Sequence, residues 1–253
     1  MYLWRRRANQ NWSSKNEEKL RIIAGDGLTV IEQPNRKQLQ FELASNQRAQ
    51  LEKVANKFGG RIEKLPRDWL KRALRHKTKP IKIGHRRLRI PAGAAFGTGQ
   101  HATTAMSLRL LEKATRNWDR DWSAFDLGTG SGILALAAKC LGARRAVGID
   151  NDPIAISTAK QNARLNKIRG VSFRVGDVRN CKFTRQLDLV TANLFSELLV
   201  ETLPKIRTAR WLILSGILRS QERSVGRALT RNRIEIVEVR RRGKWVAILA
   251  ARS

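Results

Sequence analysis

The chain has 253 residues, of which 42% are apolar and seven are tryptophan, so it is long enough to bury a substantial core and its composition argues against disorder. Lysine and arginine total 51 against 21 aspartates and glutamates, a net charge of +30. No apolar run approaches the roughly 18 residues that cross a membrane, and no secretory signal follows the first residues, so we expect a cytoplasmic protein.

The positive charge is spread along the chain, because residues 1–89 carry 23 of the basic and 8 of the acidic side chains. A field of this sign attracts polyanions such as RNA. A general solubility charge or a compositional bias toward arginine is the alternative interpretation. The two cysteines, Cys140 and Cys181, lack the paired spacing of a metal site or a disulfide framework, so no metal is predicted.

The first third of the chain predicts a small α+β domain over residues 1–66. Residues 1–20 are polar and basic, and we expect the start to be poorly ordered. Period-two alternation and turn residues predict strands at 28–32, 38–43 and 61–65, and a helix at 46–58 ends at a glycine pair.

Residues 67–90 are predicted to connect this domain to a larger one. A helix is expected over 68–75, followed by a basic linker or hairpin over 76–89. A loop rich in glycine and threonine, residues 91–104, precedes an amphipathic helix at 106–112. Such a loop could fold over a bound ligand, whereas His101 within it is interpreted as a structural hydrogen-bonding residue.

From residue 123 strands and helices alternate, which predicts a parallel sheet covered on both faces and a catalytic domain over 91–253. Two final strands face each other across Arg241-Arg242-Gly243 as an antiparallel hairpin. The fold class is therefore a Rossmann-like, doubly wound α/β sheet with an antiparallel terminal hairpin. The predicted strands are 124–127, 146–150, 171–175, 187–192, 211–214, 234–240 and 245–250, and the helices are 133–141, 154–166, 197–206 and 220–230.

The strongest functional signal is the turn from Asp126 to Gly132, in which Gly128, Gly130 and Gly132 follow the first strand of the larger domain. Glycines allow a tight turn and a close approach of backbone N–H groups to a ligand. Dinucleotide-binding turns place the third glycine one residue later. The shorter spacing is typical of a turn that lines S-adenosylmethionine, and a plain strand-to-helix turn is the alternative.

Acids at the ends of the next two strands support the same ligand. Asp150 lies where doubly wound nucleotide folds place an acid that accepts both ribose hydroxyls. Asp177 follows the third strand and could accept from the adenine amino group. Each alone could be a turn-forming aspartate, but all three features in this order favour an adenosyl ligand.

Asn193 and Phe195 follow the fourth strand and are the predicted catalytic residues. An asparagine oxygen can accept from an amine and aim the nitrogen lone pair at a methyl carbon, and an aromatic face can stabilise the cationic nitrogen that forms. The pattern resembles the Asn-Pro-Pro-aromatic signature of amino-group methyltransferases without its prolines. A helix cap is the alternative for Asn193.

Four motifs together resemble the PrmA family, which methylates a large-subunit ribosomal protein on lysine side-chain amines and an N-terminal amine. They are Ala95-Phe96-Gly97-Thr98-Gly99-x-His101-x-Thr103-Thr104, Gly128-x-Gly130-Ser131-Gly132-Ile133-Leu134-Ala135, Ala192-Asn193-Leu194 and Leu214-Ser215-Gly216-Ile217-Leu218. The resemblance is close over residues 80–253 and looser over 28–75, and the first 27 residues look shorter and more polar than in the family.

The resemblance implies an N-terminal domain that recognises the ribosomal protein and a catalytic domain that binds S-adenosylmethionine. Two alternatives stay open, a methyltransferase of amino groups in rRNA or another nucleic acid, and a non-catalytic ribosome-associated factor. The basic surface could contact rRNA in each case. The predicted cofactor-binding residues are Phe96, Thr98, Thr104, Asp126, Gly128, Gly130, Gly132, Asp150, Asp177 and Asn193.

Overall fold

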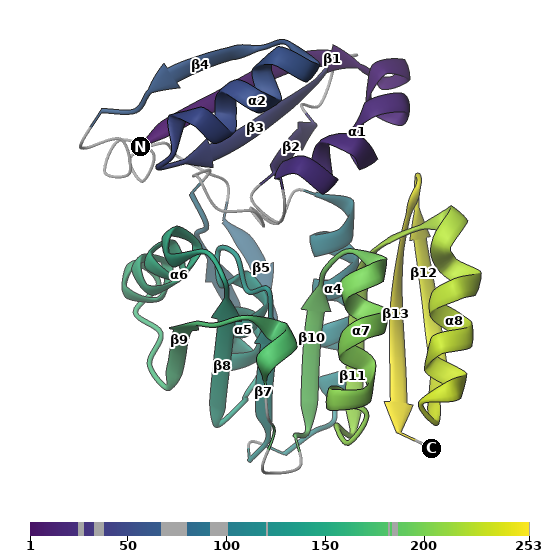
Figure 1. Ribbon diagram of the computed structural model, residues 1–253. Coiled ribbons are helices and arrows are strands. Elements are labelled where there is room, and N and C mark those ends of the chain that lie inside the picture. Colours follow the sequence, from purple (N-terminus) through teal and green to yellow (C-terminus); the bar gives the residue numbers. More distant parts are fainter. Residues whose placement is uncertain are drawn as a thin grey trace. The chain divides into compact units, whose positions relative to one another are not determined.

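The computed structural model describes residues 1–24, 28–32, 38–66, 80–91, 101–119, 121–181, 183 and 187–252. They belong to two compact units, of which the smaller contains residues 1–66 and the larger contains 80–90 and the chain from His101 onward (Figure 1). The predicted division into 1–66, 67–90 and 91–253 stays a prediction, because residues 67–79 and 92–100 lie outside the described part. The predicted helix at 68–75 falls there, as do Phe96 and Thr98.

The smaller unit is an antiparallel four-stranded sheet in the order β2-β3-β1-β4, packed against two helices. This is a split βαβ arrangement, because β3 lies between β1 and β2, the two strands that α1 connects. The predicted strands and helix at 28–65 are confirmed. The elements are β1 Tyr2–Asn9, α1 Gln10–Ala24, β2 Leu28–Glu32, β3 Gln38–Ser45, α2 Arg48–Phe58 and β4 Arg61–Lys64.

The expectation that the chain starts poorly ordered is wrong, because β1 is a central strand of this sheet. Trp4 on β1 is fully buried, and its indole N–H donates to the carbonyl of Gly59 over 2.8 Å. The following helix, α1, buries polar residues: Ser13 donates to the Glu17 carboxylate over 2.8 Å, and both side chains are buried. A sequence that looks polar therefore forms part of a core.

The larger unit is built on a seven-stranded sheet in the order β12-β13-β11-β10-β7-β8-β9. Strands β7 to β11 are parallel, and β13 is antiparallel to both of its neighbours, β11 and β12. The predicted fold class, a doubly wound sheet with an antiparallel terminal hairpin, is confirmed. The strands are β7 Ser123–Leu127, β8 Arg145–Asp150, β9 Val171–Val175, β10 Leu189–Asn193, β11 Trp211–Leu218, β12 Ile234–Arg242 and β13 Trp245–Arg252.

Helices cover both faces of this sheet, and each face has its own hydrophobic core. Alternate residues of one strand enter different cores, as Leu189 and Val190 of β10 do. One face packs against α4 Ala102–Thr115, α5 Ile133–Cys140, α6 Pro153–Leu165 and the short hairpin of β5 Ile81–Ile83 and β6 Arg86–Leu88; the other packs against α7 Ser196–Ile206 and α8 Glu222–Arg231. None of the helices within the described ranges is long and apolar enough to cross a membrane.

Sheet order determines where a ligand can bind. From β7 the chain continues outward through β8 to β9, and it then returns to place β10 on the other side of β7. In open α/β sheets, ligands bind beyond the carboxyl ends of the strands where the order reverses. The residues that follow β7, β8, β9 and β10 therefore form the candidate site.

Candidate active site

The glycine turn after β7 leads directly into α5. Gly128, Gly130 and Gly132 all have positive φ, at 65°, 53° and 81°. A Cβ on Gly128 would lie 2.3 Å from the Leu194 side chain, and one on Gly132 would lie 2.9 Å from the Ala159 Cβ. Backbone conformation and close packing thus both require glycine here, whatever ligand the turn also holds.

Asp126, on β7, connects this turn to β10, the strand that pairs with β7 in the sheet. Its carboxylate accepts hydrogen bonds from the Thr129 hydroxyl and, on β10, from the Thr191 hydroxyl, both at 2.6 Å. The side chain is buried, and burial raises the pKa of Asp126 to about 6 although the two hydroxyls act to lower it. Both oxygens of Asp126 hold the framework of the site, and its contact with a cofactor stays a prediction.

Asp150 ends β8 and reaches the glycine turn, and its predicted contact with ribose stays a prediction. One carboxylate oxygen accepts the Gly130 N–H over 2.8 Å, and the other accepts the Asp152 N–H over 3.0 Å. The buried carboxylate is therefore held in a fixed orientation beside the loop.

Asp177 follows β9 and caps the short 3₁₀ helix Val178–Asn180. Its carboxylate accepts the Arg179 N–H over 2.8 Å and lies 3.6 Å from the Arg179 guanidinium. The structure thus shows the turn-forming role that the sequence left open. A contact with adenine stays a prediction.

Asn193 ends β10, directly beside Ser215 of β11. Its amide oxygen lies 3.0 Å from the Ser215 hydroxyl, which in turn lies 2.7 Å from the Ser107 hydroxyl of α4. The helix-cap alternative for Asn193 is wrong, because the residue that precedes α7 as its N-cap is Phe195. Asn193 and Phe195 are both half-buried.

Sequence reasoning missed Ser107 and Ser215, although Ser215 lies in one of the motifs that carried the resemblance. Both side chains are fully buried. A bulge at Gly216, with φ 85°, brings β11 close to the segment after β10, and a Cβ there would lie 2.3 Å from the Leu194 carbonyl oxygen. The signal available in the sequence was a serine followed by glycine directly after the predicted strand 211–214.

Two more predicted residues, Thr104 and His101, lie at the start of α4. The buried hydroxyl of Thr104 has no hydrogen-bond partner among the described residues. His101 precedes the helix, where its ring nitrogen lies 2.7 Å from the Thr103 hydroxyl, and its ring packs edge-on against Trp245. These contacts agree with a structural role for His101.

Known proteins resemble the chain over most of its length. The family model for ribosomal protein L11 methyltransferase (PrmA) matches residues 29–253. A ribosomal protein L11 methyltransferase of Alkaliphilus oremlandii is 37% identical, over 62% of this chain and 51% of the relative. Another, of Symbiobacterium thermophilum, is 40% identical, over 64% and 53%. The chain thus spans about half the length of these curated relatives.

A solved structure gives the same result for the fold. The crystal structure of a ribosomal protein L11 methylase from Lactobacillus delbrueckii subsp. bulgaricus superimposes with a TM-score of 0.62 at 28% sequence identity. The match covers 71% of this chain and 92% of that one.

Proposed function

Because its residues 29–253 match the family model, the chain belongs to the ribosomal protein L11 methyltransferase (PrmA) family, and we propose that it methylates an amine of a large-subunit ribosomal protein with S-adenosylmethionine. The observation that carries this proposal is the placement of Asn193 at the carboxyl edge of the sheet, on the strand next to the glycine turn. A ribosomal protein substrate would place the reaction in the cytoplasm.

The described residues fit S-adenosylmethionine at this edge. The buried Thr104 hydroxyl is available to a ligand, since it has no partner in the described part of the chain. Asp150, fixed beside Gly130, supplies a carboxylate of the type that binds ribose hydroxyls. The cofactor supplies a methyl group already activated on a sulfonium, so the protein must orient and desolvate the acceptor.

Asn193 is proposed to accept a hydrogen bond from the substrate amine and so direct its lone pair. The amine must be neutral to react, whereas a lysine in water keeps its proton up to a pKa near 10.4. Burial against the protein would lower that pKa. The face of Phe195 is proposed to stabilise the cationic nitrogen that forms, and the proton then passes to water.

The Asn193→Ala variant tests this role. Loss of an oriented hydrogen bond to the reacting group should lower kcat by roughly 100-fold, while affinity for S-adenosylmethionine changes little. Turnover is measured with labelled cofactor and affinity by calorimetry. Asn232→Ala, at the C-terminal end of α8, is the control for an asparagine outside the site. Equal losses in kcat and cofactor affinity would contradict the catalytic role.

The net charge of +30 favours a second candidate, an amino-group methyltransferase that acts on nucleic acid. Labelled S-adenosylmethionine incubated separately with ribosomal protein L11 and with rRNA distinguishes the two, because we expect label only in the protein. A non-catalytic, ribosome-associated role would require that calorimetry detect no binding of S-adenosylmethionine at all.

A further inference from the structure

Four polar groups form a line from α4 to the proposed catalytic residue. The Ser107 hydroxyl lies 3.0 Å from the carbonyl of Thr103, and the two serine hydroxyls are 2.7 Å apart. The Ser215 hydroxyl is 3.0 Å from the Asn193 amide atom that the structure assigns as oxygen. Each of these three distances is that of a hydrogen bond.

The number of hydrogens determines the direction of the line. Each serine hydroxyl carries one hydrogen, and the Thr103 carbonyl carries none. If the Asn193 atom beside Ser215 were the amide oxygen, three hydrogen bonds would have to share two hydrogens. If it is the amide nitrogen, Asn193 donates to Ser215, Ser215 donates to Ser107, and Ser107 donates to Thr103. All three contacts are then satisfied.

The two arrangements differ only by a half-turn of the Asn193 amide, which exchanges oxygen and nitrogen positions of nearly equal shape. Polar groups buried in a core strongly favour the arrangement that satisfies every contact. Ser107 and Ser215 are both fully buried, so water does not compete for their hydroxyls. The bulge at Gly216 keeps β11 close enough to Asn193 for the line to be continuous.

We propose that Ser107 and Ser215 are positioning residues that hold the Asn193 amide with its nitrogen toward β11 and its oxygen toward the acceptor amine. The inference rests on the proposed function, in which that oxygen accepts from the substrate. The reversed amide would instead present N–H groups, which cannot accept a hydrogen bond from an amine. A residue of α4 thus controls the direction of a hydrogen bond at the end of β10.

Two serine variants and their combination test the direction. In Ser107→Ala, the Ser215 hydroxyl loses its acceptor and turns to donate to Asn193, which favours the reversed amide. In Ser215→Ala, the amide has no bias in either direction. One hydrogen bond corresponds to roughly tenfold in rate, so kcat should fall about tenfold in Ser107→Ala and about threefold in Ser215→Ala, with KM for S-adenosylmethionine changed less.

The double variant separates orientation from simple packing. Because it lacks the serine that reverses the amide, it should recover to the kcat of Ser215→Ala, although it carries two substitutions. A packing role predicts that the double variant is slower than either single variant, and that result, or an unchanged kcat in Ser107→Ala, would overturn the inference. Thr115→Val is the control, because it removes another buried α4 hydroxyl that donates to a carbonyl one turn earlier.

A readout without turnover keeps this inference separate from the proposed function. In selectively labelled protein, nuclear Overhauser effects should join the Asn193 amide protons to the Ser215 β-protons, and they should weaken in Ser107→Ala. If the wild-type chain methylates nothing, the proposed function fails while these spectra still decide the orientation. Nuclear Overhauser effects of equal intensity in the wild type and in Ser107→Ala would show that Ser107 does not set the orientation of the Asn193 amide.

Discussion

The burial of Asp126 has an energetic cost that depends on pH. The pKa of this carboxyl is raised by desolvation from an ordinary value of 3.8 to about 6. Below pH 3.8 it is protonated whether the chain is folded or unfolded. Between pH 3.8 and 6 the unfolded chain binds fewer protons than the folded one, so the contribution of Asp126 to stability falls as pH rises.

The Asp126→Asn variant removes this titration, and its amide can still contact both threonine hydroxyls if one of them accepts instead of donating. The free energy of unfolding of the variant minus that of the wild type should therefore increase from pH 4 to pH 6, by up to about 3 kcal/mol, and then level off. Urea denaturation of both proteins across this range measures the difference. A difference that does not vary with pH would show that Asp126 is ionised throughout.

At the scale of single residues, the sequence predicted where site residues lie better than it predicted which residues hydrogen-bond to them. Asp150 ends one predicted strand and Asn193 directly follows another, so the strand pattern located both residues. The residues that hold this site lie far away in the sequence: Ser107 and Ser215 are 108 positions apart, and Thr191 is 65 from Asp126. Local patterns carry no information about such pairs, because neighbouring strands and helices bring them together only in the fold.

Among the elements, the parallel sheet was predictable because its strands are apolar and bounded by turns, whereas β1 and α1 were not. Half of the side chains of β1 are not hydrophobic, and Arg6 on it places its guanidinium 4.4 Å from the ring of Trp12. On α1, Ser13 and Glu17 satisfy each other inside the core, so the helix lacks a clear apolar stripe. Because polar side chains on β1 and α1 find partners within the fold, neither element shows the apolar pattern from which burial is predicted.

The central position of β1 makes a prediction about the stability of the smaller unit. Trp4→Ala should lower the free energy of unfolding of this unit by about 3–5 kcal/mol, because it leaves a cavity and removes the indole N–H that donates to the Gly59 carbonyl. Circular dichroism during chemical denaturation measures the loss. Arg7→Ala, an exposed site on the same strand, should change stability by no more than about 0.5 kcal/mol. Similar effects of both substitutions would argue against a buried central strand.

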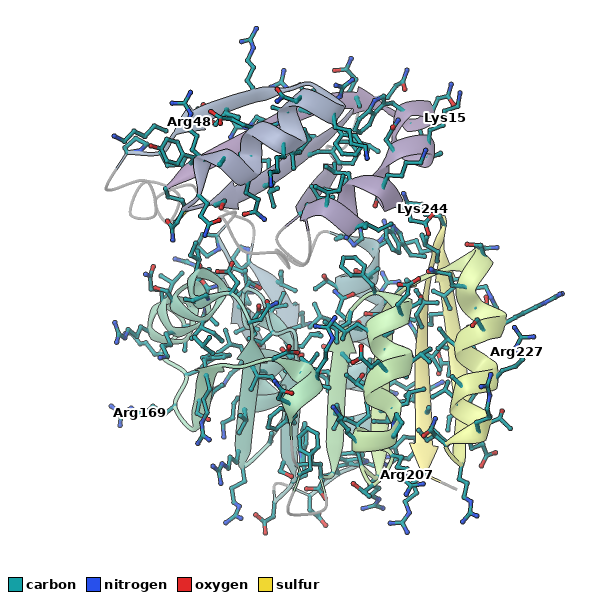
Figure 2. All side chains as sticks on the ribbon, in the orientation of Figure 1. Lys15, Arg48, Arg169, Arg207, Arg227 and Lys244 are labelled. Carbon is teal, nitrogen blue, oxygen red and sulfur yellow. The ribbon has the colours of Figure 1, made fainter. Side chains whose placement is uncertain are left out.

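Across the whole molecule, positive charge is distributed rather than gathered on one element. Figure 2 shows Lys15 and Arg48 on the smaller unit and Arg169, Arg207, Arg227 and Lys244 at separate places on the larger one. All six side chains are exposed. The 21 acidic residues offset only 21 of the 51 basic ones, and the field of the remaining 30 positive charges extends into the solvent.

That field gives opposite expectations for two forms of the proposed substrate. A basic ribosomal protein free in solution is repelled, and salt screens the repulsion over a Debye length of about 8–10 Å near physiological ionic strength. The same protein on rRNA lies within a negative field that attracts the chain, and salt weakens that attraction. Raising NaCl from 20 to 200 mM should therefore raise kcat/KM for the free protein and lower it for ribosomal particles, measured with labelled S-adenosylmethionine below saturation.

Methylation of a short neutral peptide that carries the acceptor amine is the control for salt acting on the enzyme itself, and it should change little. If salt lowered kcat/KM for the free protein as steeply as for the particles, local acidic contacts rather than the overall charge would govern encounter with the substrate.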